Sequence, residues 1–434
     1  MTKYFSPYWV LIFSLFAATF SVSANQTLSP KTYQALTDIQ TLLTEGQYAD
    51  VEEELAELES NLSAGFGLAL SYQIHAQLYL AQENTPQAIV YFNKALELEA
   101  MKAVQAVSLA TNVAQLYLSE GDAQAAIIVL LSRIESSELE KSGSVMAMAY
   151  ITLGSAYQVD GDFSSSISWL EEGVKRARKP RENWLQMLMA AHYQLKQYPQ
   201  AIDLLSQLIV INEAKEEYWL QKASLYQMQQ KPKKSLEVLE LAYVRGVLKK
   251  EDGLILLVQL LVTQGIPERG GRLLNDMLKN NAVTLNESNW ALLASAWIQG
   301  RERLSAIMAL ESAALLSKKE ANEKQSITEA PENLANKKAI SSKARAAKLY
   351  YRAAQLQFDE DQFSASIVNY KNALSLGLSG KKVGVALLMQ GNSYFELADY
   401  NNAKLYFSKA LAEPSSSNSA RAWLDYMQQL ELFE

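Results

Sequence analysis

Four tyrosines recur in one frame, and this recurrence constrains the fold more than any other feature of the chain. Each follows a small residue by three positions and precedes another small residue by nine. The tyrosines are Tyr79, Tyr117, Tyr157 and Tyr226; the small residues before them are Ala76, Ala114, Gly154 and Ala223, and those after them are Ala88, Ala126, Ser166 and Ser235. Self-similarity at such a period indicates a helical repeat array. An array of this kind is a scaffold for holding other molecules, so the pattern argues against an enzyme.

The same frame can be followed along most of the chain. The residues at the tyrosine position, called frame positions below, are Leu42, Tyr79, Tyr117, Tyr157, His192, Tyr226, Leu261, Trp297, Gln357 and Tyr394. Their spacing is 34 to 40 residues, apart from one interval of 60 between Trp297 and Gln357. Several repeats are degenerate, the first and the seventh most of all, so ten is an upper count.

Packing within a pair of antiparallel helices explains the residue types in the frame. Small residues let the two backbones approach closely, and the aromatic side chain fills the wedge between neighbouring repeats. The clearest copies are Ala76, Tyr79, Ala88, Phe92 and Ala95, then Trp219, Ala223 and Tyr226, and finally Gly391, Tyr394, Ala403, Phe407 and Ala410. This pattern closely resembles the tetratricopeptide repeat, which implies a right-handed superhelical array of helix pairs.

Composition agrees with an all-α fold. The 434 residues include only 18 glycines and 9 prolines, as expected for helices joined by short turns. Turn signals such as Glu120-Gly121-Asp122 and Asp160-Gly161-Asp162 recur between the predicted helices. No run of alternating apolar and polar residues predicts a strand.

The N-terminus has the pattern of a cleavable signal peptide over residues 1–24. Lys3 precedes an apolar stretch of about 13 residues from Tyr8 to Phe20, and Val22-Ser23-Ala24 provides a cleavage site after Ala24. A membrane span needs about 20 residues, although an uncleaved anchor remains an alternative. Zero cysteines exclude disulfides and a lipid anchor on cysteine. We therefore expect a periplasmic protein of a Gram-negative bacterium, without stable membrane insertion after cleavage.

Charge is unevenly distributed along the chain. The formal net charge of −7 argues against nucleic acid as a partner. A basic cluster at 175–181 ends a predicted helix, where cations complement the helix dipole, and a binding patch for an anion is the alternative. An acidic run at 52–59 has the pattern of a solvated helix face.

A search for catalytic, cofactor or metal residues gives none. His75 and His192 are the only histidines, and both fall at positions that predict packing. No pair has metal-ligand spacing, and no glycine loop has the pattern of a phosphate site. The 22 tyrosines could form stacking platforms, but most of them lie at packing positions.

The interval of 60 residues contains a segment that interrupts the repeats. Residues 317–345 are rich in lysine, acids, Asn and Ser, and Pro331 lies among them. Few large apolar residues are available there to offset the entropy of ordering. We expect a mobile insertion between an N-terminal array at 25–316 and a C-terminal array with a capping helix at 346–434. A solvated helical extension broken at Pro331 is the alternative.

The resemblance also implies where a partner would bind. In tetratricopeptide arrays the first helix of each pair lines a groove that holds a peptide. Carried over repeat by repeat, the groove positions are Asn183, Gln186, Tyr193, Glu217, Gln227, Asp252 and Gln259. Amide side chains can both donate to and accept from an extended backbone. The alternative is that these residues are merely solvated.

A narrower resemblance covers about residues 180–280. The succession Glu182-Asn183-Trp184, Glu217 to Tyr226, Leu239 to Tyr243 and Gln264-Gly265-Ile266-Pro267 resembles periplasmic tetratricopeptide proteins associated with TonB systems. It implies an accessory role with TonB, ExbB and ExbD, and neighbouring genes would test this. An envelope assembly factor for outer-membrane proteins or exopolysaccharide is the alternative. A cell-wall or carbohydrate-processing enzyme would need paired carboxylates in one cleft, which the pattern lacks. The sequence leaves the oligomeric state open.

Overall fold

The computed structural model describes residues 28–134, 143–326 and 332–430. The predicted signal peptide, with its cleavage site after Ala24, lies outside these residues. The chain forms two compact halves, one up to Asn212 and one from Glu213. Within the described ranges every regular element is an α-helix, as the sequence predicted, and none is both long and apolar enough to cross a membrane.

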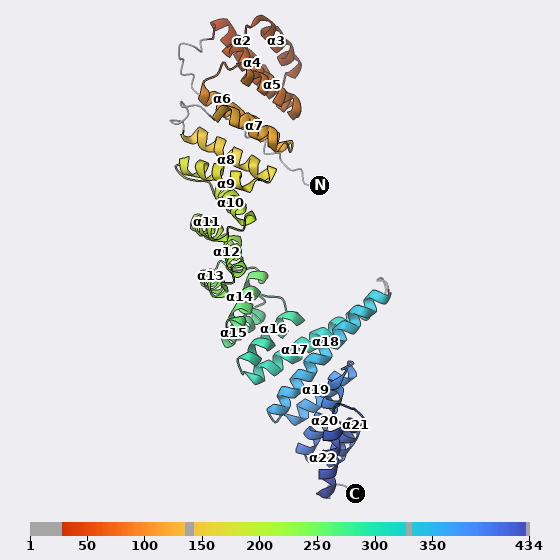
Figure 1. Cartoon of the computed structure of the whole chain (residues 1–434). Helices are drawn as coiled ribbons and strands as arrows, with labels where there is room; N and C mark the ends of the chain where they lie inside the picture. Colours follow the sequence, from red (N-terminus) through yellow and green to blue (C-terminus); the bar gives the residue numbers. More distant parts are fainter. Residues whose placement is uncertain (1–27, 135–142, 327–331, 431–434) are drawn as a thin grey trace. The chain divides into compact units, whose positions relative to one another are not determined.

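The described residues of the N-terminal half form five helix pairs, which follow one another in sequence order (Figure 1). The pairs are α2 (Pro30–Glu45) with α3 (Tyr48–Asn61), α4 (Phe66–Ala81) with α5 (Thr85–Glu97), α6 (Ala103–Ser119) with α7 (Ala123–Ile134), α8 (Gly143–Asp160) with α9 (Phe163–Arg176), and α10 (Glu182–Gln194) with α11 (Tyr198–Ile211). First helices of consecutive pairs also contact one another, as α6 and α8 do.

The C-terminal half consists of five further pairs and a last helix. The pairs are α12 (Glu216–Met228) with α13 (Pro232–Val244), α14 (Glu251–Thr263) with α15 (Pro267–Lys279), α16 (Glu287–Gln299) with α17 (Arg303–Ser326), α18 (Glu332–Asp359) with α19 (Phe363–Ser375), and α20 (Lys381–Glu396) with α21 (Tyr400–Leu411); α22 (Ser417–Gln429) packs on α21.

One turn geometry confirms the repeat frame in all ten pairs. Four residues after each frame position the backbone is left-handed, with φ between 56° and 90°. Glycine occupies this site in four repeats, and other residues, such as Lys196 and Ala398, occupy it in the rest. In nine of the ten repeats the next backbone N–H donates to the carbonyl of the frame residue, for example Asp399 to Tyr394 at 2.9 Å. This is the hydrogen bond that ends a helix at a left-handed residue, so even the degenerate repeats close in the same way.

Small residues and aromatics pack as the pattern predicted. The alanines of the frame, from Ala76, Ala88, Ala95 and Ala114 to Ala223, Ala403 and Ala410, are fully buried, and Phe92, Trp219 and Phe407 are buried with them. Gly154 and Gly391 are so close to the second helix that a Cβ atom would lie 2.6 Å from Leu170 and 2.5 Å from Phe407, respectively.

The frame tyrosines are half-buried rather than fully buried, and the hydroxyl groups of two of them reach the preceding repeat. Asn93 on α5 donates to the hydroxyl of Tyr117 at 2.7 Å, and Lys371 on α19 donates to that of Tyr394 at 2.8 Å. Tyr79, Tyr157 and Tyr226 are half-buried as well. Tyr117 and Tyr394 therefore each fill a wedge between repeats and also offer a polar tip to the preceding repeat.

The segment 317–345, for which we expect a mobile insertion or a helical extension broken at Pro331, is helical in the residues that the structure describes there. Helix α17 continues to Ser326 and α18 begins at Glu332, so that the two helices extend side by side as a long hairpin (Figure 1). Ser317, Ala321 and Ser342 are fully buried, and the Ser317 hydroxyl donates to the Ser342 carbonyl at 2.9 Å. Small side chains let the helices approach closely, so few large apolar residues are needed. Residues 327–331, with Pro331, lie outside the described part.

The predicted domain boundary also differs from the structure. Helices α17 and α18 pack on α16 and α19, so packing is continuous through 317–345. The two compact halves divide between Asn212 and Glu213 instead.

Candidate functional site

The predicted groove residues lie on first helices but are divided between the two halves of the chain. Asn183, Gln186 and Tyr193 are on α10 of the N-terminal half. Glu217 and Gln227 are on α12, and Asp252 and Gln259 are on α14, all in the C-terminal half. All of them are exposed except Gln186, which is half-buried. The two groups are therefore considered separately.

In the C-terminal group, two of the four side chains are engaged within the protein. Glu217 forms an ion pair with Lys250, and the hydrogen bond from Lys250 lowers the pKa of Glu217 below its usual value. Gln227 donates to the hydroxyl of Ser235 at 3.3 Å. These contacts link α12 to the segment before α14 and to α13, so the two residues have a structural role that the sequence did not predict.

Glu251 is another carboxylate of this half that has a structural role. Glu251, the first residue of α14, accepts hydrogen bonds from the Thr284 hydroxyl at 2.6 Å, the Asn289 amide at 2.8 Å and the Thr284 backbone N–H at 3.0 Å. These donors, the Thr284 hydroxyl first, lower the pKa of Glu251. Because the folded-state pKa is lowered, the stabilisation is present above the unfolded pKa of about 4.3 and is lost as the pH falls through the folded value.

We therefore expect Glu251→Gln to be less stable than the parent at pH 7, and to approach the parent below about pH 4. Urea unfolding at the two pH values measures this. Asp252→Asn is the matched control, because the neighbouring Asp252 is exposed and should show a smaller change at both pH values. An equal loss of stability for Glu251→Gln at both pH values would contradict the expectation.

The predicted groove residues lie nine, six or two residues before a frame position, or one residue after it. We call these the groove offsets (−9, −6, −2 and +1) and apply them to the other repeats of the N-terminal half. In the repeats of Tyr79, Tyr117, Tyr157 and His192 these positions hold Leu70, Gln73, Gln77, Leu80, Ser108, Thr111, Gln115, Leu118, Met148, Ile151, Ser155, Gln158, Asn183, Gln186, Ala190 and Tyr193. We call this set the uncharged face. Ser108, Asn183 and Tyr193 are exposed, Thr111 and Ile151 are buried, and the other members are half-buried.

Amide groups of the uncharged face reach from one repeat to the next. Gln115 donates to the Thr152 hydroxyl at 3.5 Å, and Gln158 donates to the Met187 carbonyl at 3.2 Å. These contacts join α6 to α8 and α8 to α10, which places the amides on the side where first helices meet. Tyr193 is 40% exposed and contacts Tyr198, with ring centroids 6.2 Å apart.

Both histidines are buried and packed, as their positions predicted. The ring of His75 stacks on Tyr91, with centroids 3.8 Å apart, and its Nδ1 lies 3.0 Å from a carboxylate oxygen of Glu59. His192 Nδ1 lies 2.6 Å from the side-chain oxygen of Gln197. Glu59 is thus an exception to the solvated acidic face, whereas Glu52, Glu53, Glu54 and Glu57 are exposed.

The basic cluster at 175–181 is partly packed. Arg176 pairs with Glu172 and covers the Tyr150 ring at 4.7 Å, and Arg181 lies 5.4 Å from the Trp184 ring. Lys175, Arg178 and Lys179 are exposed.

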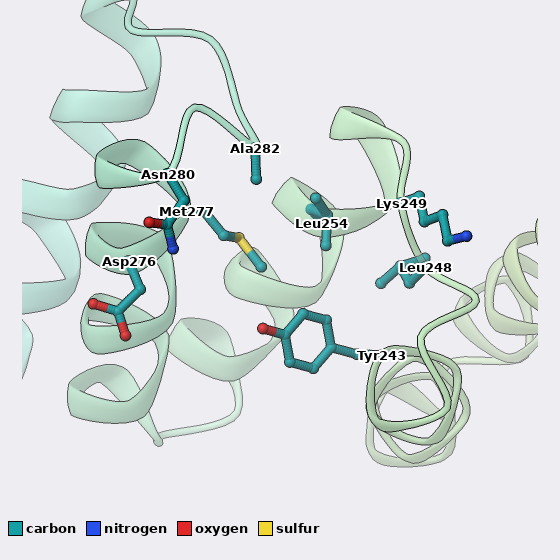
Figure 2. Close-up of a pocket in the computed structure, with 8 residues that line it drawn as sticks. All are labelled: Tyr243, Leu248, Lys249, Leu254, Asp276, Met277, Asn280 and Ala282. Atoms are coloured by element: carbon teal, nitrogen blue, oxygen red, sulfur yellow. The ribbon is translucent and has the colours of Figure 1, made fainter.

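A pocket of about 310 Å³ lies at the ends of α13 and α15 (Figure 2). Leu248, Leu254 and Met277 form its apolar part, and Tyr243 lies beside them. Asp276 is its single carboxylate, so the lining offers no acid–base pair of carboxylates.

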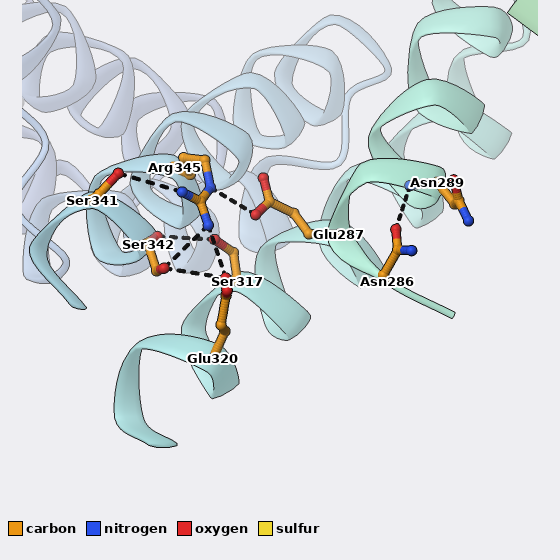
Figure 3. Close-up of polar contacts among 8 residues, drawn as sticks. All are labelled: Asn286, Glu287, Asn289, Ser317, Glu320, Ser341, Ser342 and Arg345. Carbon is orange, nitrogen blue, oxygen red and sulfur yellow. Dashed lines mark hydrogen bonds and ion pairs between the residues drawn. The ribbon is translucent and has the colours of Figure 1, made fainter. Parts of the chain in front are cut away.

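A second pocket, of about 580 Å³, lies where the long hairpin passes the start of α16. Arg345 lies between two of its carboxylates, with nitrogen atoms 2.7 Å from Glu287 and 2.8 Å from Glu320 (Figure 3). It also donates to Ser342 at 3.1 Å. The two carboxylates are thereby used to join α16, α17 and α18, which is a structural role that the repeat frame did not predict.

Gln357 is a frame residue that takes part in another polar network, and its residue type could have predicted that network from the sequence. It is 3% exposed, donates to Glu311 at 2.9 Å and accepts from Asn369 at 2.8 Å. A glutamine in place of the usual tyrosine was the available signal, because a buried amide needs polar partners. Among the residues with described positions, no group of three or more acidic or histidine side chains is arranged to hold a metal ion.

Comparison with known proteins supports the repeat assignment. The family model described as "Tetratricopeptide repeat" matches residues 69–100 and 385–413, which correspond to α4–α5 and α20–α21. No curated protein matches the chain.

Several solved structures are similar to the chain. A tetratricopeptide repeat protein from Parabacteroides merdae is 13% identical, with 62% of this chain and 99% of that chain covered and a TM-score of 0.37. YrrB, described as a TPR protein with an unusual peptide-binding site, is 17% identical over 50% of this chain and 96% of that chain, with a TM-score of 0.33. A chain of Naa15/Naa10 bound to HypK-THB is 12% identical over 87% of this chain and 62% of that chain, with a TM-score of 0.42.

Proposed function

We propose that this chain, with its tetratricopeptide repeats, is a non-catalytic scaffold that binds a protein partner on the uncharged face of its N-terminal half. The observation that carries the proposal is the row of accessible amide and hydroxyl side chains along α4, α6, α8 and α10. Tetratricopeptide proteins are generally protein-binding scaffolds rather than enzymes. Amide side chains suit this role because each can donate to and accept from a peptide backbone.

The cellular setting is part of the same proposal. The signal-peptide pattern over residues 1–24 and the absence of cysteine support a periplasmic location. The resemblance over about residues 180–280 supports an accessory role in a TonB-type system, with TonB, ExbB or ExbD as the first partners to test. Osmotic-shock release and intact mass of a chain beginning at Asn25 would test the location, and retention of residues 1–24 in a membrane fraction would refute it.

The binding surface can be tested with a triple variant. Asn183→Ala, Gln186→Ala and Tyr193→Ala together should weaken partner capture at least tenfold while helicity and melting temperature stay close to the parent. Each lost contact to a neutral group contributes about 0.5–1.5 kcal/mol, and tenfold in affinity is about 1.4 kcal/mol. Capture from periplasmic extract, followed by calorimetry with the periplasmic domain of TonB, measures the change.

The matched control places the same number of changes on the second helix of that repeat. Gln200, Gln207 and Val210 on α11 are all exposed, so changing them to alanine should leave capture intact. Equal capture by the parent and the α10 variant would rule out the uncharged face. Capture of outer-membrane proteins or a polysaccharide synthase, without TonB components, would favour an envelope assembly factor.

A further inference from the structure

Charged residues are nearly absent from four consecutive first helices of the N-terminal half. Helices α4 and α6 contain no Asp, Glu, Lys or Arg. Helices α8 and α10 each contain one, Asp160 as the last residue of α8 and Glu182 as the first residue of α10. The four partner helices carry eight: Lys94, Glu97, Arg133, Glu171, Glu172, Lys175, Arg176 and Asp203. Charge is therefore concentrated away from the surface where first helices meet.

Burial explains only part of this depletion. Three residues of the uncharged face are exposed and eleven are half-buried, whereas exposed positions on helices usually carry polar or charged residues. Asn183, Ser108 and Tyr193 are exposed, yet none of the three is an Asp, Glu, Lys or Arg. In the C-terminal half the same offsets hold Glu217, Asp252 and Lys348, so the helix-pair fold itself does not forbid charge there.

The chemistry of this face selects its ligand. A partner's charged side chain would lose water on docking and find no opposite charge, which costs free energy. Peptide N–H and C=O groups, and small polar or apolar side chains, would instead meet amides, hydroxyls, leucines and a tyrosine. We infer that the uncharged face binds an extended protein segment that itself lacks charged residues, such as one rich in Gln, Ser, Gly and Leu. This inference rests on the proposed function and adds the class of its partner.

A carbohydrate chain is also uncharged, but the face fits it less well. Sugar sites use exposed aromatic rings as stacking platforms, and Tyr193 is the only member of the uncharged face that is aromatic. Leu70, Leu80 and Leu118 are half-exposed and suit aliphatic side chains of a peptide.

The test uses the full mature chain and three sets of synthetic dodecapeptides. One set is built from Gln, Ser, Gly and Leu, and the others have Glu or Lys at every third position. The uncharged set should bind at least about tenfold more tightly than either charged set. Its affinity should change less than about twofold between 50 and 500 mM NaCl, since no charge pair is available to be screened. Maltohexaose is the carbohydrate probe and should not bind.

Charge insertion separates this inference from the proposed function. Gln115→Glu and Gln115→Lys should each weaken binding of the uncharged peptides about tenfold or more, because either sign adds an unpaired charge to the interface. Ser132→Glu and Ser132→Lys, at an exposed site on α7, are the matched controls and should bind like the parent.

Each outcome of these binding experiments either supports or contradicts the inference. If a charged set binds best and the α10 triple variant abolishes that binding, the face is correct and the partner class is wrong. If binding survives the triple variant, the proposed function fails as well. Tighter binding by one of the two Gln115 variants, binding of maltohexaose alone, or no binding by any peptide set would overturn the inference.

Discussion

Phe407→Ala should lower the free energy of unfolding of the last repeat by about 3–5 kcal/mol, the usual cost of removing a buried phenylalanine ring. The ring is fully buried between Gly391 and Trp423. It stacks on the Trp423 ring with centroids 5.4 Å apart and planes inclined by 6°. Gly391 has no side chain that could move into the cavity, so the space left by the ring should stay largely unfilled.

Hydrogen exchange is the appropriate measurement, because the stability of a repeat array is largely local. Protection should fall in α20, α21 and α22, and much less in α12 to α15. Leu405→Ala is the control on the same helix: Leu405 is 48% exposed, so its loss should cost well under half as much. Similar protection in the two variants would show that Phe407 is not the centre of this core.

Gly154→Ala should destabilise the N-terminal half by about 1–3 kcal/mol, although alanine is a better helix former than glycine by about 1 kcal/mol. The added Cβ would lie 2.6 Å from Leu170 Cγ and 3.0 Å from the Ser166 carbonyl oxygen. Leu170 is fully buried, so it cannot move away without disturbing its own contacts. The two helices would have to separate, and that separation loses packing along both.

Gly143→Ala provides the control within the same helix. A Cβ at Gly143 would meet only the Arg176 carbonyl oxygen, at 3.8 Å, which is an ordinary contact. We expect its melting temperature to equal or slightly exceed that of the parent, while Gly154→Ala melts several degrees lower. A Gly154→Ala protein as stable as Gly143→Ala would mean that α8 and α9 are not closely packed at the frame position.

The repeat frame was predictable because local rules and packing rules agree in most pairs. A small residue stands three positions before the frame position in seven of the ten repeats and allows close approach, and a left-handed residue four positions after it ends the first helix in all ten. Leu42, Leu261 and Trp297 keep this geometry without the tyrosine, because the turn depends on the backbone while the tyrosine only fills the wedge. The degenerate repeats could therefore be counted but not established from residue types.

The candidate site was predictable by position and only partly by role. Asn183 and Tyr193 are exposed on the first-helix side as the offsets required. Glu217 and Gln227 occupy equivalent offsets, but Glu217 pairs with Lys250 in the loop before α14 and Gln227 donates to Ser235 on the second helix of its own pair. A periodic pattern identifies which way a side chain points, whereas its partners depend on loops and neighbouring repeats.

The sequence by itself determined the all-α fold, the repeat frame and the concentration of charge away from four first helices, because each depends on residue types at a fixed period. Only the tertiary structure decided that 317–326 and 332–345 are helical, and that Arg345 joins Glu287 to Glu320. Low hydrophobicity predicted disorder there, since burial of large apolar side chains is the usual source of stability. Close contact between small residues such as Ser317 and Ser342 stabilises the hairpin instead, and that contact exists only when two distant segments of the chain are brought together.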